Sequence, residues 1–171
     1  SYCNISFDHV SRNVNLKYIT VTFGKSKDMA CVSKSIPKML DKIVFGTDME
    51  PFWDDGMIRF SIADMHRIGV KVVQDKCGNQ YMCLMKLIKK SKFVEVCGKI
   101  RTDRALVLDI RNQYNVKVKS VASVGLFNTS HPEWYNKDIV YAIGEIVIPN
   151  TYDESDEICS SGIHFFSLCY N

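Results

Sequence analysis

IVYAIGEIVIPNTYDESDEICSSGIHFFSLCYN, residues 139–171, is the stretch of this sequence that decides the fold. It holds two apolar segments, residues 139–149 and 162–168, on either side of an acidic turn. In the second segment Ile163 and Phe165 leave water only if other strands cover them. We therefore expect the closing segment to be a buried strand that docks into a sheet made by earlier residues, with the acidic turn as a hairpin loop.

The length and composition of the chain predict a single compact domain over residues 1–171. The chain is 46% hydrophobic and 24% charged, which is ordinary usage for a globular protein. It contains no run of about 18 apolar residues, and its first residues lack the apolar core of a signal peptide. We therefore expect no membrane contact and no secretion, and a cytoplasmic location, in the host cytosol if the protein is viral.

Seven cysteines lie mostly within apolar segments such as MACV, YMCLM and VEVCG. This placement is typical of reduced thiols that pack as small hydrophobic side chains, so we expect free thiols and no disulfide framework. The motifs GxxxxGK[ST], GxGxxG, GxSxG and HExxH do not occur. The sequence therefore predicts no catalytic residue, no cofactor and no metal site.

Several short strands with one or two short helices predict an α+β fold with a mostly antiparallel sheet. Residues 36–45 predict a helix, because Ser35 can cap it, Pro37 fits its first turn and Gly46 ends it. Residues 61–67 leave two alternatives open, the end of a strand or a short helical turn.

A β-hairpin is the clearest local prediction. Residues 70–73 and 80–88 are joined by DKCGN, which supplies the Asp, Gly and Asn of a tight reversal. Residues 80–88 are apolar at nearly every position, so we expect them to form a central strand that is covered on both faces. Further strands are predicted at residues 16–23, 29–32, 57–62, 93–97, 105–110 and 116–121, and a loop at 128–137.

Charge is distributed unevenly along the chain. Residues 86–119 hold ten basic and three acidic side chains, whereas residues 133–157 hold seven acidic side chains and one basic one. Clustered cations neutralise phosphates, so one hypothesis is that the basic segment binds RNA or DNA. The candidate residues are Lys89, Lys90, Lys92, Arg101 and Arg104. The alternative is a solvated sheet face that meets the acidic end of the chain.

His164 is the other candidate for chemistry. It follows Cys159 by five residues, and a Cys and His pair can act as nucleophile and base or can bind a metal. Since no CxxC or HxxxH motif accompanies the pair, we favour a histidine in the core or at the rim of the sheet. Four nearby acids lack the glycine of a calcium loop and are interpreted as a solvated turn: Asp153, Glu154, Asp156 and Glu157.

The closing stretch also carries a motif of YxxGE, Pro, aromatic–Asp and CxxGIHFF. Its residues are Tyr141, Gly144, Glu145, Pro149, Tyr152, Asp153, Cys159, Gly162, Ile163, His164, Phe165 and Phe166, with Cys97, Arg101, Arg104 and Ala105 in matching places upstream. With them, residues 76–171 resemble the uncharacterised domain that closes many pentapeptide-repeat proteins of phages and large DNA viruses. The resemblance implies a viral or phage accessory protein of unassigned biochemistry, with residues 1–75 as an N-terminal part of unassigned type.

A second, weaker similarity concerns the strand around His164. A Gly-Ile-aromatic-Phe strand is similar to the wall of the nicotinamide pocket in ADP-ribosyltransferases, which implies a ligand near Tyr141, Glu145 and His164. Only seven residues follow His164 and none of them is Glu, so a working transferase of that layout is not expected.

We therefore expect a non-enzymatic module for protein interaction or assembly, with a protein partner or self-association. Two alternatives remain open. One is a nucleotide-binding or degenerate ADP-ribosyltransferase-like protein, and the other is an RNA- or DNA-binding protein that uses residues 86–119.

Overall fold

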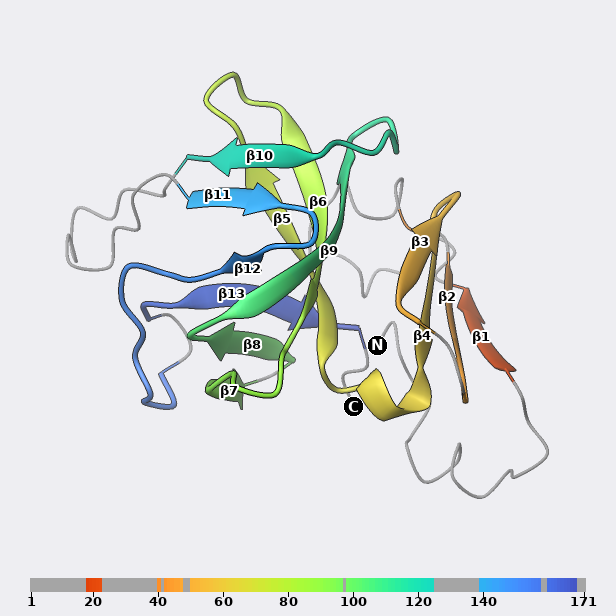
Figure 1. Ribbon diagram of the computed structural model, residues 1–171, viewed down its shortest axis with the longest axis horizontal. Coiled ribbons are helices and arrows are strands. Elements are labelled where there is room, and N and C mark those ends of the chain that lie inside the picture. Colours follow the sequence, from red (N-terminus) through yellow and green to blue (C-terminus); the bar gives the residue numbers. More distant parts are fainter. Residues whose placement is uncertain are drawn as a thin grey trace.

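A computed structural model of the chain shows a mostly β fold (Figure 1). The structure describes residues 18–22, 40, 42–47, 50–96, 98–124, 139–157 and 160–168. These residues contain one short 3₁₀ turn, η2 (Ile62–Asp64), and no α-helix. The expected α+β class is therefore wrong. Within the same ranges, no helix has the length and hydrophobicity needed to cross a bilayer.

The helix predicted at residues 36–45 is one source of this error. Its last residues belong to strand β2 (Lys42–Gly46), and most of its earlier residues lie outside those that the structure describes. Ile43 and Phe45 of β2 are both buried, which is the period of two that belongs to a strand. The short apolar run that follows Lys42 fits either period, so the pairing of β2 with β4 decides its structure.

The N-terminal sheet has four strands in the order β1-β2-β4-β3. Besides β2, these are β1 (Tyr18–Thr22), β3 (Phe52–Asp54) and β4 (Met57–Ser61). β2 and β4 run parallel, and the other neighbours are antiparallel. The strands expected around β1 and β4 are confirmed. η2 follows β4 directly, so both alternatives for that region occur in succession. The strand expected at residues 29–32 lies outside the described residues.

The larger sheet has seven antiparallel strands in the order β12-β9-β6-β5-β13-β8-β7 and curls into a half-barrel (Figure 1). The strands are β5 (Ile68–Gln74), β6 (Gln80–Lys86), β7 (Phe93–Val96), β8 (Lys99–Thr102), β9 (Ala105–Asn112), β12 (Ile146–Val147) and β13 (Ile163–Ser167). The predicted hairpin of β5 and β6 and the central place of β6 are confirmed, as are the strands predicted near β7 and β9. The strand expected at residues 116–121 begins later, as β10 (Ser120–Ser123). The predicted loop at 128–137 lies outside the described residues.

β13 confirms that the closing segment docks into a sheet of earlier residues, because it lies between β5 and β8. The acidic residues before it do not form a hairpin loop, since β12 pairs with β9 and not with β13. Gly69 of β5 permits the close approach of β13. A Cβ atom at Gly69 would lie 2.2 Å from the carbonyl oxygen of Phe166 and 2.5 Å from the ring of Phe165.

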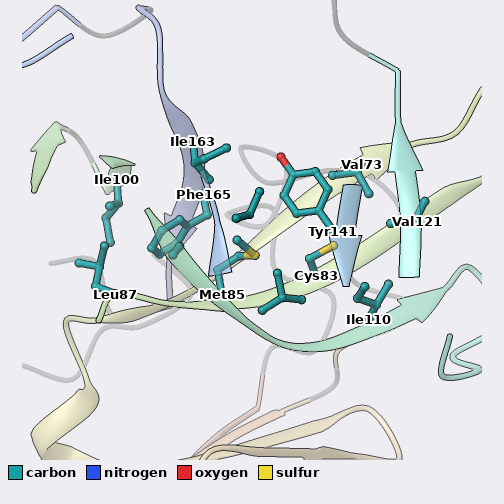
Figure 2. Packing of buried hydrophobic residues seen from close by; sticks show 13 residues of the cluster. Val73, Cys83, Met85, Leu87, Ile100, Ile110, Val121, Tyr141, Ile163 and Phe165 are labelled. Carbon is teal, nitrogen blue, oxygen red and sulfur yellow. The ribbon is translucent and has the colours of Figure 1, made fainter. Parts of the chain in front are cut away.

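Two clusters of buried side chains hold the sheets together. The first joins the N-terminal sheet to the outer side of the larger sheet and includes Phe45 and Phe60, whose rings stack at 5.8 Å, opposite Leu84 of β6. The second fills the inside of the curl (Figure 2). β10 and β11 (Ile139–Ala142) form a two-stranded sheet that covers this inside, and Tyr141 of β11 belongs to the cluster.

Candidate functional site

The site with the most unusual chemistry lies where β13 separates from β5. The two strands pair only at Phe166 with Val70 and at Ser167 with Gly69, whereas β13 and β8 pair over four residues. Beyond the last β5 pair, the ammonium group of Lys71 donates a hydrogen bond to the backbone carbonyl oxygen of His164 over 2.9 Å. A buried carbonyl needs a donor, and here a lysine side chain supplies what a neighbouring strand would otherwise supply.

His164 lies half-buried beside this split. Ile163 and Phe165 point into the curl, so the alternation of the strand sends the His164 side chain to the outer side. Its Nε2 atom is buried and has no hydrogen-bond partner. Burial lowers the pKa of His164 to about 3, and a hydrogen bond with the backbone of Ser160 acts in the opposite direction. The imidazole is therefore neutral at pH 7.

Arg101 is the most buried charged residue of the site, with 2% of its surface exposed. It lies opposite His164 in the β8–β13 ladder. Its guanidinium donates to the backbone carbonyl oxygens of Asp153 (3.1 Å), Ser155 and Glu157. The acidic segment therefore folds around a buried arginine, and its backbone is fixed by that side chain.

The packing of Arg101 under the acidic segment also requires a glycine at position 162. A Cβ atom at Gly162 would lie 2.7 Å from the Cγ atom of Arg101, and its φ of +145° is one that other residues rarely adopt. The glycine of the CxxGIHFF motif thus serves the packing of Arg101 under the acidic segment.

The acidic segment, residues 153–157, presents carboxylates to solvent. Asp153 is the exception, because its carboxylate accepts hydrogen bonds from the backbone N–H and hydroxyl of Ser155 and from the hydroxyl of Ser160. These bonds, led by that from Ser160, lower the pKa of Asp153 to about 2. The described residues contain no group of three His, Cys, Asp or Glu side chains placed to hold a metal ion.

The lysines proposed for nucleic-acid binding lie on an exposed turn between β6 and β7. Ser91 at its centre donates from its hydroxyl to the carbonyl oxygen of Arg104 over 2.7 Å, and the N–H of Lys92 donates to Asp103 over 2.8 Å. Lys92 also forms a solvent-exposed ion pair with Glu154 at 3.5 Å. Lys89, Lys90 and Lys92 thus share one firmly held turn, while Arg101 is buried elsewhere.

Tyr141, Glu145 and His164, proposed as a ligand site, are not brought together. Tyr141 lies inside the curl beside Cys83, and burial raises the pKa of its hydroxyl. Glu145 is exposed in the turn between β11 and β12. No hydrogen bond or ion pair joins any two of these three described residues.

Sequence reasoning missed two features. Lys71 interrupts an apolar strand, IGVKVVQ, and that interruption was the available signal. The other feature is a cavity of about 580 Å³ lined by Thr47, Glu50, Ser61, Ile62, Ala63, Asp64 and Lys86. Its lining comes from three separated segments, which no local pattern connects, and Lys86 and Asp64 already pair there at 3.3 Å.

A family model described as a family of unknown function (DUF5758) matches residues 64–168, from η2 to the residue after β13. No curated protein and no solved structure matches the chain. The matched residues cover the whole seven-stranded sheet, and the chain therefore belongs to the DUF5758 family of unknown function.

Proposed function

We propose that this protein is a non-enzymatic interaction module that binds another protein on the outer side of the β11–β12 segment. The observation that carries the proposal is a strip of three exposed apolar side chains there. Val140 is 61% exposed, Ile146 50% and Ile148 63%. Leaving such side chains in water costs about 25 cal/mol for each Å² of apolar surface, which a partner recovers by covering them.

The strip follows from strand alternation. Tyr141 and Val147 are buried in the cluster that fills the curl, so their neighbours Val140, Ile146 and Ile148 point away from it. Across the β10–β11 ladder, Val140 lies opposite Ala122, which is also exposed. We refer to Val140, Ile146 and Ile148 as the outer strip.

The charge of the segment that carries the outer strip indicates the kind of partner. Residues 139–157 contain no lysine or arginine, and Glu145, next to Ile146, is exposed. A second copy of the same surface would bring like charges together, whereas a partner with basic residues beside an apolar segment would be complementary. β12 has a ladder partner, β9, on one side only and ends the sheet. An extended apolar segment flanked by Lys or Arg therefore fits best.

A peptide panel tests this proposal. Fluorescence polarisation would compare extended apolar peptides with Lys flanks against the same cores with Glu flanks. We expect the Lys-flanked peptides to bind, and the triple variant Val140→Ser, Ile146→Ser, Ile148→Ser to bind at least tenfold more weakly, about 1.4 kcal/mol. Phe52→Ser is the control, since Phe52 is 51% exposed on the other sheet.

Two outcomes would contradict this proposal. One is equal binding of both peptide sets by the intact protein and the triple variant. The other is self-association in analytical ultracentrifugation that the triple variant abolishes, which would make a second copy the occupant.

The resemblance in residues 141–166 supports a further part of this proposal. It favours an accessory protein of a phage or large DNA virus, which would act in the host cytosol beside longer pentapeptide-repeat chains. Finding the gene among cellular genes with no viral neighbours would count against this part.

RNA or DNA binding is a second candidate function, favoured by the three lysines on the turn at residues 89–92. Phosphate contacts release counterions, so binding would weaken steeply with salt. We expect a salt-dependent mobility shift that Lys89→Glu, Lys90→Glu and Lys92→Glu together abolish. Binding that does not depend on salt would exclude this function.

A further inference from the structure

The cavity of about 580 Å³ lies where strands β2 and β4 end. These strands run parallel, and Gly46 at the end of β2 lies opposite Ser61 at the end of β4. The chain leaves both strands at the same end of the N-terminal sheet, β2 through Thr47 and β4 through the 3₁₀ turn η2 (Figure 1). Segments that diverge from adjacent parallel strands leave a crevice between them, and sites for small molecules have volumes of about 300 to 1,000 Å³.

The lining of this cavity carries one negative charge that no cation of the lining balances. Asp64 of η2 and Lys86 at the end of β6 form an ion pair at 3.3 Å, so their charges cancel each other. Glu50 also lines the cavity, and it forms no hydrogen bond or ion pair with any residue that the structure describes. The carboxylate of Glu50 is therefore the uncompensated charge of the lining.

Two hydroxyl groups share the lining with Glu50. Ser61 precedes η2, but its side chain makes no capping hydrogen bond there. Within the described part of the chain, the hydroxyls of Ser61 and Thr47 have no hydrogen-bond partner, so their lone pairs can accept from a ligand. Ile62 and Ala63 add apolar surface. The cavity thus combines one free carboxylate, two hydroxyl acceptors and a small apolar wall.

We propose that this cavity binds an alkylammonium group, the charged end of a primary aliphatic amine. The ammonium has three N–H donors, which the Glu50 carboxylate and the two hydroxyls accept, and its methylene stem lies against Ile62 and Ala63. An anion of the same shape is repelled by Glu50, and a neutral alcohol lacks the charge-assisted hydrogen bond. Since Asp64 is already paired with Lys86, the cavity holds one ammonium group.

Thermal unfolding at pH 7 tests this site with three four-carbon probes, butylamine, butanol and butyrate, at matched ionic strength. The amine is charged at this pH, because its pKa is close to that of lysine, about 10.4. We expect a saturable rise in melting temperature with butylamine alone, since a ligand that binds only the folded state stabilises it. None of the lining residues belongs to the outer strip, so this inference stands apart from the proposed function.

Two variants change the charge of the lining in opposite directions. Glu50 is exposed, so Glu50→Gln should fold normally and bind butylamine at least about tenfold more weakly. Lys86→Gln leaves Asp64 without its cation, so it should bind the amine more tightly, a gain that damage to the fold would not produce. Glu145→Gln is the control, because Glu145 is exposed and does not line the cavity, and it should keep the response of the intact protein.

Alkylammonium groups occur on free polyamines and on the lysine side chains of other proteins. Spermidine and Nα-acetyl-lysine amide distinguish these two sources, and saturable binding of either one that Glu50→Gln weakens supports the site. The proposal is overturned if no amine raises the melting temperature, or if butanol or butyrate acts as strongly as butylamine. It is also overturned if Glu50→Gln keeps the full response, or if Lys86→Gln weakens the binding of butylamine.

Discussion

β13 and the β11–β12 segment lie within 30 residues of each other, yet they differ in how much apolar side-chain surface they leave exposed. β13 has a strand on each side, and Ile163 and Phe165 are almost completely buried. The segment at β11–β12 holds only a two-residue strand of the larger sheet and leaves the outer strip in water. The difference teaches that the side chains of β13 stabilise the fold, whereas those of the outer strip do not and form the surface that we propose for a partner.

Removal of residues 162–171 should give the largest effect. Burying one large apolar side chain contributes about 1.5 to 3 kcal/mol, and β13 and its flank bury Ile163, Phe165 and Leu168. Their loss approaches the whole stability of a typical domain, about 5 to 15 kcal/mol. We expect circular dichroism to show no cooperative thermal transition. Removal of residues 169–171 alone is the control, and a normal transition in the longer truncation would disprove the role of β13.

Gly69→Ala should give the next largest effect, because the new Cβ meets the backbone of β13 at 2.2 Å. Overpacking of this kind costs about 1 to 3 kcal/mol, and a backbone neighbour places this case near the upper end. Gly144→Ala is the matched control, since a Cβ there meets nothing within 4 Å and only its φ of +83° causes strain. Urea unfolding should show the larger loss at Gly69. Equal losses would mean that β5 and β13 tolerate separation.

Stability should also fall as the pH is lowered from about 6.5 towards 3. The pKa of His164 is about 3 in the folded protein against 6.5 for an ordinary histidine, so the unfolded chain binds the extra proton in this window. The contribution is fully present above pH 6.5 and is lost as the pH falls.

His164→Gln tests this pH dependence, because it removes the titrating group. Between pH 4.5 and 7 its free energy of unfolding should depend less on pH than that of the intact protein. Asp153 stays ionised over this range, since its pKa is about 2. An unchanged slope in His164→Gln would show that His164 titrates normally.

The features that the sequence predicted well are those with local causes. Asp75 accepts hydrogen bonds from the N–H groups of Cys77 and Asn79, both at 2.9 Å, so the DKCGN turn is held by its own residues. The burial of the closing segment also followed from its composition. By contrast, β2 was mistaken for a helix because its parallel pairing with β4 joins segments that no turn connects.

The candidate site was predicted in part. His164 was identified as a candidate, but its neighbours Lys71 and Lys99 come from strands far away in the sequence, and Lys71 contacts it across 93 positions. Arg101 was assigned to a basic surface because its spacing among other cations gives no sign of burial. Which charges meet at β13 depends on strand order, and the order of seven strands is a property of the whole sheet.

The smallest expected change in stability concerns two adjacent residues of β12, one on the exposed side of the strand and one on its buried side. Ile146 is 50% exposed and Val147 5% exposed, so they point to opposite sides of β12. Ile146→Ser should change the free energy of unfolding by no more than about 0.5 kcal/mol, as is usual for a surface position. Val147→Ser should cost about 2 kcal/mol or more, because it places a hydroxyl in the apolar curl. If urea unfolding shows that Ile146→Ser destabilises as much as Val147→Ser, Ile146 is packed against the protein itself, and the outer strip is no longer a free surface for a partner.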